Sequence, residues 1–70
     1  MFPNIEAERA RENISQQDLA DYLGVSLSTL KNWMNERTAI PSTALIKMSQ
    51  RWGKSVDYLL GLSDIPQKAG

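Results

Sequence analysis

The sequence contains no cysteine and no histidine among its 70 residues. The absence of cysteine excludes disulfide bonds and thiolate metal ligands. The absence of histidine removes the most common metal ligand and the most common general base of enzymes. There is also no glycine-rich phosphate-binding loop. We therefore expect a protein that is not an enzyme and that binds no cofactor, no metal and no small-molecule substrate.

Long apolar runs are missing as well. No stretch reaches the roughly 20 apolar residues that a membrane-spanning helix needs. The first ten residues, MFPNIEAERA, have neither the basic start nor the apolar run of a secretion signal. We expect a cytoplasmic protein with no membrane partner, and a chain of this length suffices for one domain with a small core.

The charges are balanced overall but unevenly distributed. Eight basic and eight acidic residues give a formal net charge of zero, which is unusual for a protein that binds nucleic acid. Residues 1–25 contain five acidic and two basic residues, whereas residues 26–54 contain one acidic and five basic residues. This segregation can create a local basic surface on a neutral protein. Equally, Lys47, Arg51 and Lys54 can be ordinary solvated charges.

Residues 16–35, QQDLADYLGVSLSTLKNWMN, carry the most informative pattern. The spacing of Leu19 with Leu23, and of Leu30 with Trp33, suits one apolar face on each of two short helices. Gly24 between them supplies the positive φ of a tight turn. The pattern predicts a helix-turn-helix, whose second helix fits the major groove of DNA. A plain helical hairpin or a protein-docking surface has the same apolar spacing, because core residues define shape and not use.

Capping signals divide the chain into helices. We expect a first helix capped by Asn4 and ended by Asn13, and a second that Ser15 and Asp18 cap and Gly24 ends. A third is expected from Ser26 to about Met34. A fourth is expected to open at Pro41 and Ser42 and to end at Gly53, and a fifth to lie between Ser55 and Gly61. The core is expected to include Leu19, Leu23, Val25, Leu30, Trp33, Leu45, Ile46, Met48, Ser49 and Trp52.

These signals predict an all-α protein, a compact bundle of five short helices with a central helix-turn-helix. Residues 1–61 are expected to form the helix-turn-helix domain, and residues 62–70 a tail or linker. No signal for a β-strand is present.

The chain resembles the lambda-repressor-like family, also called the Cro or XRE type, over residues 4 to about 61. The residues that carry the resemblance are SQQDLADYLGVSLSTLKNW, the Ile-Pro-Ser opening of the fourth helix, and SVDYLLG, in this order. The resemblance implies a sequence-specific transcription regulator of the phage or bacterial repressor type. Such a protein binds double-stranded DNA at an operator as a homodimer, within the nucleoid of a bacterial host. The alternative is a protein-interaction or antitoxin-like helix-turn-helix module.

Two positions depart from the family pattern. Met34 stands where the family often has a glutamate that pairs with Arg9, so Arg9 is expected to use Glu12 or Glu6 instead. Glu36 stands where the family often has glycine. A left-handed backbone at a glutamate is strained, so we expect Asn35 to adopt it. A carboxylate at this place can weaken phosphate binding.

The recognition helix is expected at about residues 27–34. Its first residues, Ser26, Leu27 and Ser28, reach deepest into a major groove. Ser28 and Asn32 are the candidates for base contacts, and Lys31 can bind a base or a phosphate. Leu27 can meet a thymine methyl group or serve as an ordinary surface or minor core residue.

Backbone contacts are expected on both sides of this helix. Thr29 can face a phosphate or support the helix cap. Gln16, at the start of the second helix, can donate to a phosphate or remain a solvated glutamine. The resemblance implies that Asn35, Arg37 and Thr38 bind the sugar–phosphate backbone, while Arg37 can also be a plain surface charge.

The last predicted helix is rich in apolar residues for so short a chain. Val56 and Leu59 are expected to close the core of the monomer. The family places this region at the dimer interface, so Tyr58, Leu60 and Leu62 are expected to be shared with a second copy. A two-fold dimer would present two recognition helices about 34 Å apart, one turn of DNA.

Overall fold

Residues 2–62 are described by the computed structural model, and they form five α-helices without a β-strand. The helices are α1 (Pro3–Glu12), α2 (Gln16–Leu23), α3 (Leu27–Met34), α4 (Ser42–Trp52) and α5 (Val56–Leu60). The predicted all-α bundle is therefore confirmed. Apart from Leu62, the expected tail of residues 62–70 lies outside the described residues. Among the described helices, none combines the length and the hydrophobicity that a bilayer crossing requires.

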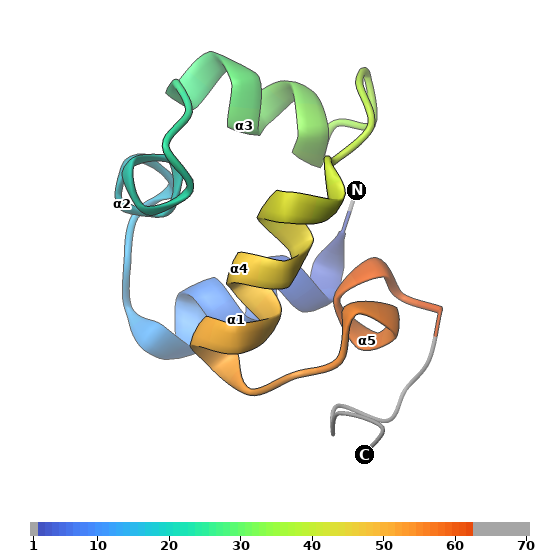
Figure 1. The fold of residues 1–70 in the computed structure, drawn as a ribbon. Helices are drawn as coiled ribbons and strands as arrows, with labels where there is room; N and C mark the ends of the chain where they lie inside the picture. The colour runs from blue at the N-terminus through green and yellow to red at the C-terminus, as the bar shows by residue number, and fades with distance from the viewer. Residues whose placement is uncertain (1, 63–70) are drawn as a thin grey trace.

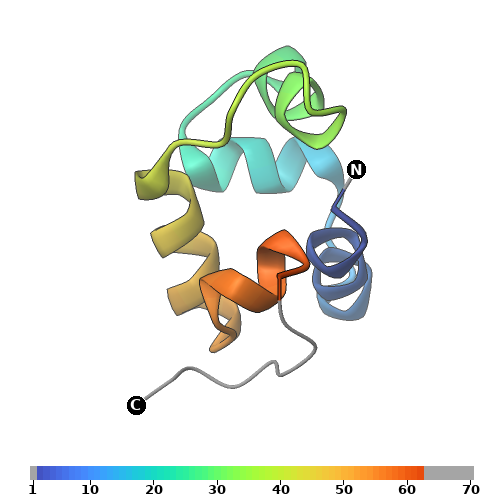
Figure 2. The same cartoon turned by 90° about the vertical axis from the view of Figure 1, so that its right-hand side faces the viewer.

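The helices surround one core, to which each contributes a fully buried side chain. These side chains are Ile5, Leu19, Leu30, Met48 and Leu59. Helix α2 is seen end-on in Figure 1 while α3 runs across the view, and Figure 2 shows the opposite, so the two helices cross steeply. Helix α5 packs against both α1 and α4 and closes the other side of the bundle (Figure 2).

Most helix ends lie where the capping signals predict them. The Ser15 hydroxyl accepts a hydrogen bond from the Asp18 amide at 3.0 Å, and the Asp18 carboxylate accepts one from the Ser15 amide at 3.1 Å. Helix α2 then ends at Gly24, whose φ is 74°. Ser26 and Ser55 cap α3 and α5 in the same way as Ser15, although without the reciprocal carboxylate. The local sequence therefore specifies these boundaries.

The predicted cap at Asn4 is wrong. Helix α1 begins at Pro3, after Phe2, and has no side-chain cap. Proline suits the first helical position because that position needs no amide hydrogen. Asn4 instead lies inside α1, and its amide nitrogen donates to the Tyr58 carbonyl oxygen at 2.7 Å. The asparagine thus joins the first helix to the last.

The left-handed residue after α3 is Glu36 and not Asn35. Glu36 has a φ of 60°, whereas Asn35 has a φ of −89°. The Glu36 amide donates to the Trp33 carbonyl and the Arg37 amide to the Asn32 carbonyl, at 3.0 and 2.9 Å. This pair of bonds is the Schellman motif, which puts the left-handed residue one place after the C-cap. Asn35 is that C-cap, so Glu36 takes the strained position.

One predicted core residue of α4 is also wrong. Leu45, Met48 and Ser49 are buried and Trp52 is partly buried, but Ile46 is 49% exposed. The buried residues of α4, which are Ala44, Leu45, Met48 and Ser49, lie on one face of the helix. Ile46 lies about 100° beyond Leu45 around the helix axis, outside this face.

Candidate nucleic-acid interface

The outer face of α3 is polar and open to solvent. Ser28, Lys31 and Asn35 are exposed. The opposite face of the helix is buried in the core through Leu30, Trp33 and Met34. In both views α3 lies at the edge of the molecule, and no other described helix covers its outer side (Figures 1 and 2). The helix is therefore anchored on one side and accessible on the other.

The start of α3 is held by its own side chains. The Ser26 hydroxyl accepts a hydrogen bond from the Thr29 amide at 3.2 Å, and the two hydroxyl oxygens lie 3.0 Å apart. Of the two roles considered for Thr29, support of the cap is thus present. Leu27 is half-buried, which leaves both of its expected roles open. Gln16 is half-buried at the first position of α2, directly after the Ser15 cap.

The loop after α3 folds back on the end of the helix. The Asn32 carbonyl oxygen accepts hydrogen bonds from the amides of Arg37 and Thr38, at 2.9 and 3.4 Å. The Arg37 and Thr38 side chains are exposed, and the Asn32 side chain is half-buried. These bonds bring the candidate backbone contacts of the loop next to the candidate base contacts of the helix.

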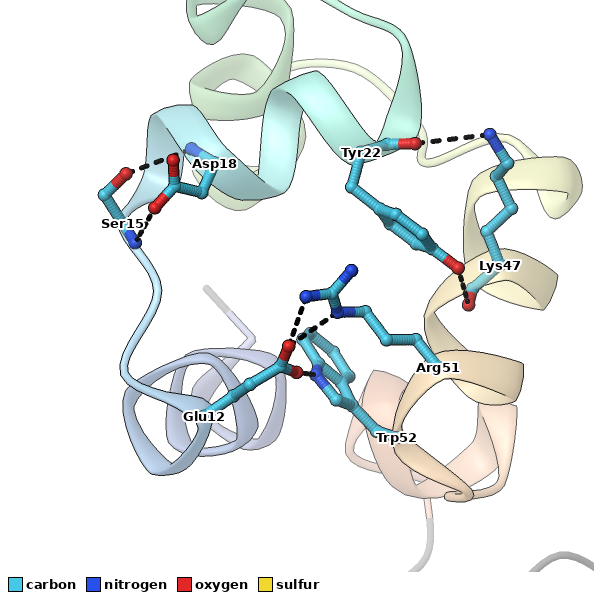
Figure 3. A network of polar contacts seen from close by, with 7 residues as sticks. All are labelled: Glu12, Ser15, Asp18, Tyr22, Lys47, Arg51 and Trp52. Carbon is cyan, nitrogen blue, oxygen red and sulfur yellow. Dashed lines mark hydrogen bonds and ion pairs between the residues drawn. The ribbon is translucent and has the colours of Figure 1, made fainter.

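The basic residues of α4 are largely engaged with their own chain (Figure 3). Arg51 donates from Nε to Glu12 Oε1 at 2.8 Å, and its Nη2 also contacts this oxygen. The Arg51 guanidinium lies over the Tyr22 ring, 4.5 Å from the ring centre. Lys47 Nζ donates to the Tyr22 carbonyl oxygen at 3.3 Å. These two cations therefore join helices, and the basic surface beside α3 rests mainly on Lys31 and Arg37.

Glu12 connects α1 to α4 through two neighbours. Its second carboxylate oxygen accepts a hydrogen bond from the Trp52 ring nitrogen (Figure 3). The hydrogen bond from Arg51 is the main cause that lowers the pKa of the Glu12 carboxyl, and the Trp52 bond acts in the same direction. The carboxylate in turn raises the pKa of Arg51.

Of the two partners predicted for Arg9, the structure selects Glu6. The Arg9 guanidinium lies 2.8 Å from the Glu6 carboxylate and also donates to the Ile14 carbonyl oxygen at 2.7 Å. Glu12 is directed to Arg51 instead, because α4 lies within its reach. The prediction is thus confirmed for Glu6 and wrong for Glu12.

A buried carboxylate at the α1–α5 contact was missed from the sequence. Glu8 is only 4% exposed and accepts hydrogen bonds from the Tyr58 hydroxyl at 3.0 Å and from Arg11 at 2.5 Å. Burial, and then the bond to Glu8, raise the pKa of Tyr58. Glu8 and Tyr58 are 50 positions apart. No local spacing signals such a pair.

The residues predicted at a dimer interface differ in accessibility. Tyr58 is half-buried and bound to Glu8, and Leu60 packs partly against the core. Leu62 is 74% exposed. Of the three, Leu62 thus offers the largest fraction of its surface to a second chain.

A sequence profile described as helix-turn-helix matches residues 5–59, which is most of the chain. The protein belongs to the lambda-repressor-like helix-turn-helix family. It is also similar to the repressor protein CI of Enterobacteria phage phi80, with 39% identity over 59 residues. That alignment covers 84% of this chain and 25% of the phage protein, so the chain spans about a quarter of the length of this relative. No solved structure gave a significant match.

Proposed function

We propose that the protein is a sequence-specific transcription regulator of the repressor type that binds double-stranded DNA with α3 in the major groove. The observation that carries this proposal is the exposed polar face of α3, displayed by a member of the helix-turn-helix family. The width of the groove admits one α-helix, and serine, asparagine and lysine side chains can bind base edges or phosphates. A regulator of this kind acts where the DNA is, in the cytoplasm of a bacterial host.

The proposed contacts divide into two groups. Ser28 and Asn32 contact bases, and Lys31 contacts a base or a phosphate. Contacts to the sugar–phosphate backbone hold the helix in register; they come from Gln16, Ser26, Thr29, Asn35, Arg37 and Thr38. Leu27 lies beside a thymine methyl group. The loop bonds to the Asn32 carbonyl support this arrangement, because they hold Arg37 and Thr38 beside Asn32 at the C-terminal end of α3.

We also propose that DNA is bound by a homodimer formed around α5. Leu62 is the main contact in this arrangement, with Leu60 and Tyr58 at its margin. A two-fold axis there would repeat α3 at the spacing of one DNA turn, about 34 Å. A palindromic operator follows from this symmetry.

The second candidate function is a protein-interaction module, which the net charge of zero favours. Salt dependence separates the two. DNA binding releases counterions, so the affinity of a regulator falls steeply with salt, and each lost phosphate contact reduces the logarithmic slope by about one. Binding that is insensitive to salt would support the interaction module.

The test begins with selection of duplexes from random DNA by the wild-type protein, followed by titrations of a selected duplex at several salt concentrations. Arg37→Ala is expected to weaken binding to selected and random duplexes alike and to reduce the salt slope by about one. Arg37→Lys keeps the charge and is the matched control. Failure to enrich any sequence would reject sequence-specific DNA binding by the protein. Equal salt slopes for wild type and Arg37→Ala would reject the phosphate contact of Arg37.

A further inference from the structure

Glu36 is a charged residue in the left-handed backbone conformation, which residues other than glycine and asparagine rarely adopt. Its φ is 60° and its side chain is exposed. Such a conformation is unfavourable for a glutamate. The strain is maintained by the Schellman bonds at the end of α3, from the Glu36 amide to Trp33 and from the Arg37 amide to Asn32.

These bonds place the carboxylate-bearing residue inside the proposed DNA-binding surface. Glu36 directly follows Asn35 and directly precedes Arg37, and both of these neighbours are exposed. The loop that contains it lies at the outer end of α3 (Figure 1). Between residues 26 and 38, Lys31 and Arg37 are basic and Glu36 is acidic. The glutamate therefore halves the net positive charge of this segment.

We propose that Glu36 is an affinity-limiting residue, whose carboxylate repels the phosphate backbone next to Arg37. The inference rests on the proposed DNA-binding function and deepens it. Phosphates are present at every step of a duplex, so the repulsion lowers affinity for all sequences and leaves the choice of sequence unchanged. Repulsion between exposed charges also weakens as salt shortens the Debye length.

Two variants separate the charge of Glu36 from its strain. Glu36→Gln removes the charge and keeps the size and the unfavourable backbone conformation. Glu36→Asn removes the charge and tolerates the left-handed conformation better. Glu36→Asp keeps the charge and serves as the matched control. Thermal unfolding of each variant is measured beside its affinity for a selected and a random duplex.

At low salt, Glu36→Gln is expected to bind both duplexes roughly threefold to tenfold more tightly than the wild type, as for one unit charge near a phosphate. The gain should shrink as salt rises. Glu36→Asn should show the same gain together with a higher melting temperature, whereas Glu36→Asp should bind like the wild type. This combination would assign the effect to charge and not to loop stability.

The inference is overturned if the wild type binds DNA but Glu36→Gln binds equally or less tightly. It is also overturned if the gain is independent of salt or is confined to one sequence. If neither the wild type nor any variant binds a duplex, the proposed function itself fails, and the role of Glu36 fails with it. Binding by the wild type thus distinguishes the two failures.

Discussion

Asn32 has two separable roles at the end of α3. Its backbone carbonyl accepts the amides of Arg37 and Thr38 and so attaches the loop to the helix. Its half-buried side chain is the proposed contact to a base. A substitution that removes only the side chain leaves the backbone bonds available, so this position can test recognition without dismantling the loop.

Asn32→Ala is expected to relax sequence preference while largely retaining affinity for random DNA. A bidentate contact between asparagine and adenine contributes about 1–3 kcal/mol of discrimination against the wrong base. The measurement is in vitro selection with wild type and variant, beside titrations of a random duplex. Preferred sites identical to those of the wild type would remove Asn32 from base recognition.

Short-range capping bonds mark where α2, α3 and α5 begin. Ser15, Ser26 and Ser55 each accept an amide hydrogen from three residues further along the chain. Helix α4 has no side-chain cap, because Pro41 occupies its N-cap position. A single serine hydroxyl therefore contributes to the stability of α2, α3 and α5, whereas α4 has no such contribution.

Ser15→Ala should lower the free energy of unfolding by about 1 kcal/mol, because it removes one half of a reciprocal capping box. Ser42→Ala is the control, since Ser42 is exposed at the first position of α4, whose cap makes no side-chain bond. Chemical denaturation of the two variants measures the difference. Equal losses of stability would show that the Ser15 hydroxyl contributes nothing as a cap.

Contacts between distant parts of the chain hold the helices together. The Glu12 carboxylate joins α1 to Arg51 and Trp52 on α4, and Asn4 and Glu8 join α1 to Tyr58 on α5. None of these contacts involves α3, whose outer side is exposed. Figure 3 shows the contacts of Glu12 between α1 and α4. The bundle is thus stabilised away from the proposed DNA-binding face.

The Glu12 contact predicts a specific acid sensitivity. The pKa of Glu12 is lower in the folded protein than its ordinary value of 4.5. Its stabilising contribution is therefore fully present above pH 4.5 and is lost as the pH falls through the lower folded pKa. Glu12→Gln should lower the melting temperature by a few degrees at most at neutral pH, because partly exposed ion pairs contribute little.

The melting temperatures of Glu12→Gln and the wild type should converge in acid. Circular dichroism melts from neutral pH to about pH 3 cover the range in which carboxyl groups of ordinary pKa are protonated. Arg51→Met is the matched variant, because it removes the partner of Glu12. Adding Arg51→Met to Glu12→Gln should change the pH dependence of the melting temperature little. A constant difference in melting temperature across this range would show that Glu12 contributes nothing through its charge.

The proposed dimerisation depends on the surface that the folded chain presents. Leu62→Lys should shift the protein to a monomer in sizing experiments while its helical circular dichroism remains unchanged, because Leu62 is 74% exposed. Leu60 is a poorer test, since it packs partly against the core. Ile46→Lys, at an exposed position of α4, is the control. A dimer that persists in Leu62→Lys would place the interface elsewhere.

Helix boundaries were largely predictable because they depend on bonds between residues three to five positions apart. Ser15 with Asp18, and the glycines after α2, α4 and α5, are such cases. The wrong prediction of the left-handed residue also concerned bonds of this short range. The C-cap of α3 is Asn35, so the left-handed position falls one residue later, on Glu36. The exposed face of α3 was predictable from periodicity, while the individual DNA contacts stay predictions.

Local sequence thus specified five helices, most of their ends and the helix-turn-helix, because these features follow from nearby hydrogen bonds and apolar spacing. The partners of Asn4, Glu8 and Glu12 depended on tertiary structure, since their partner residues lie 39 to 54 positions away in the chain. The same holds for the exposure of Ile46, because the width of the core sets how much of a helix can be buried. Only the packed orientation of the helices decides which distant side chains meet.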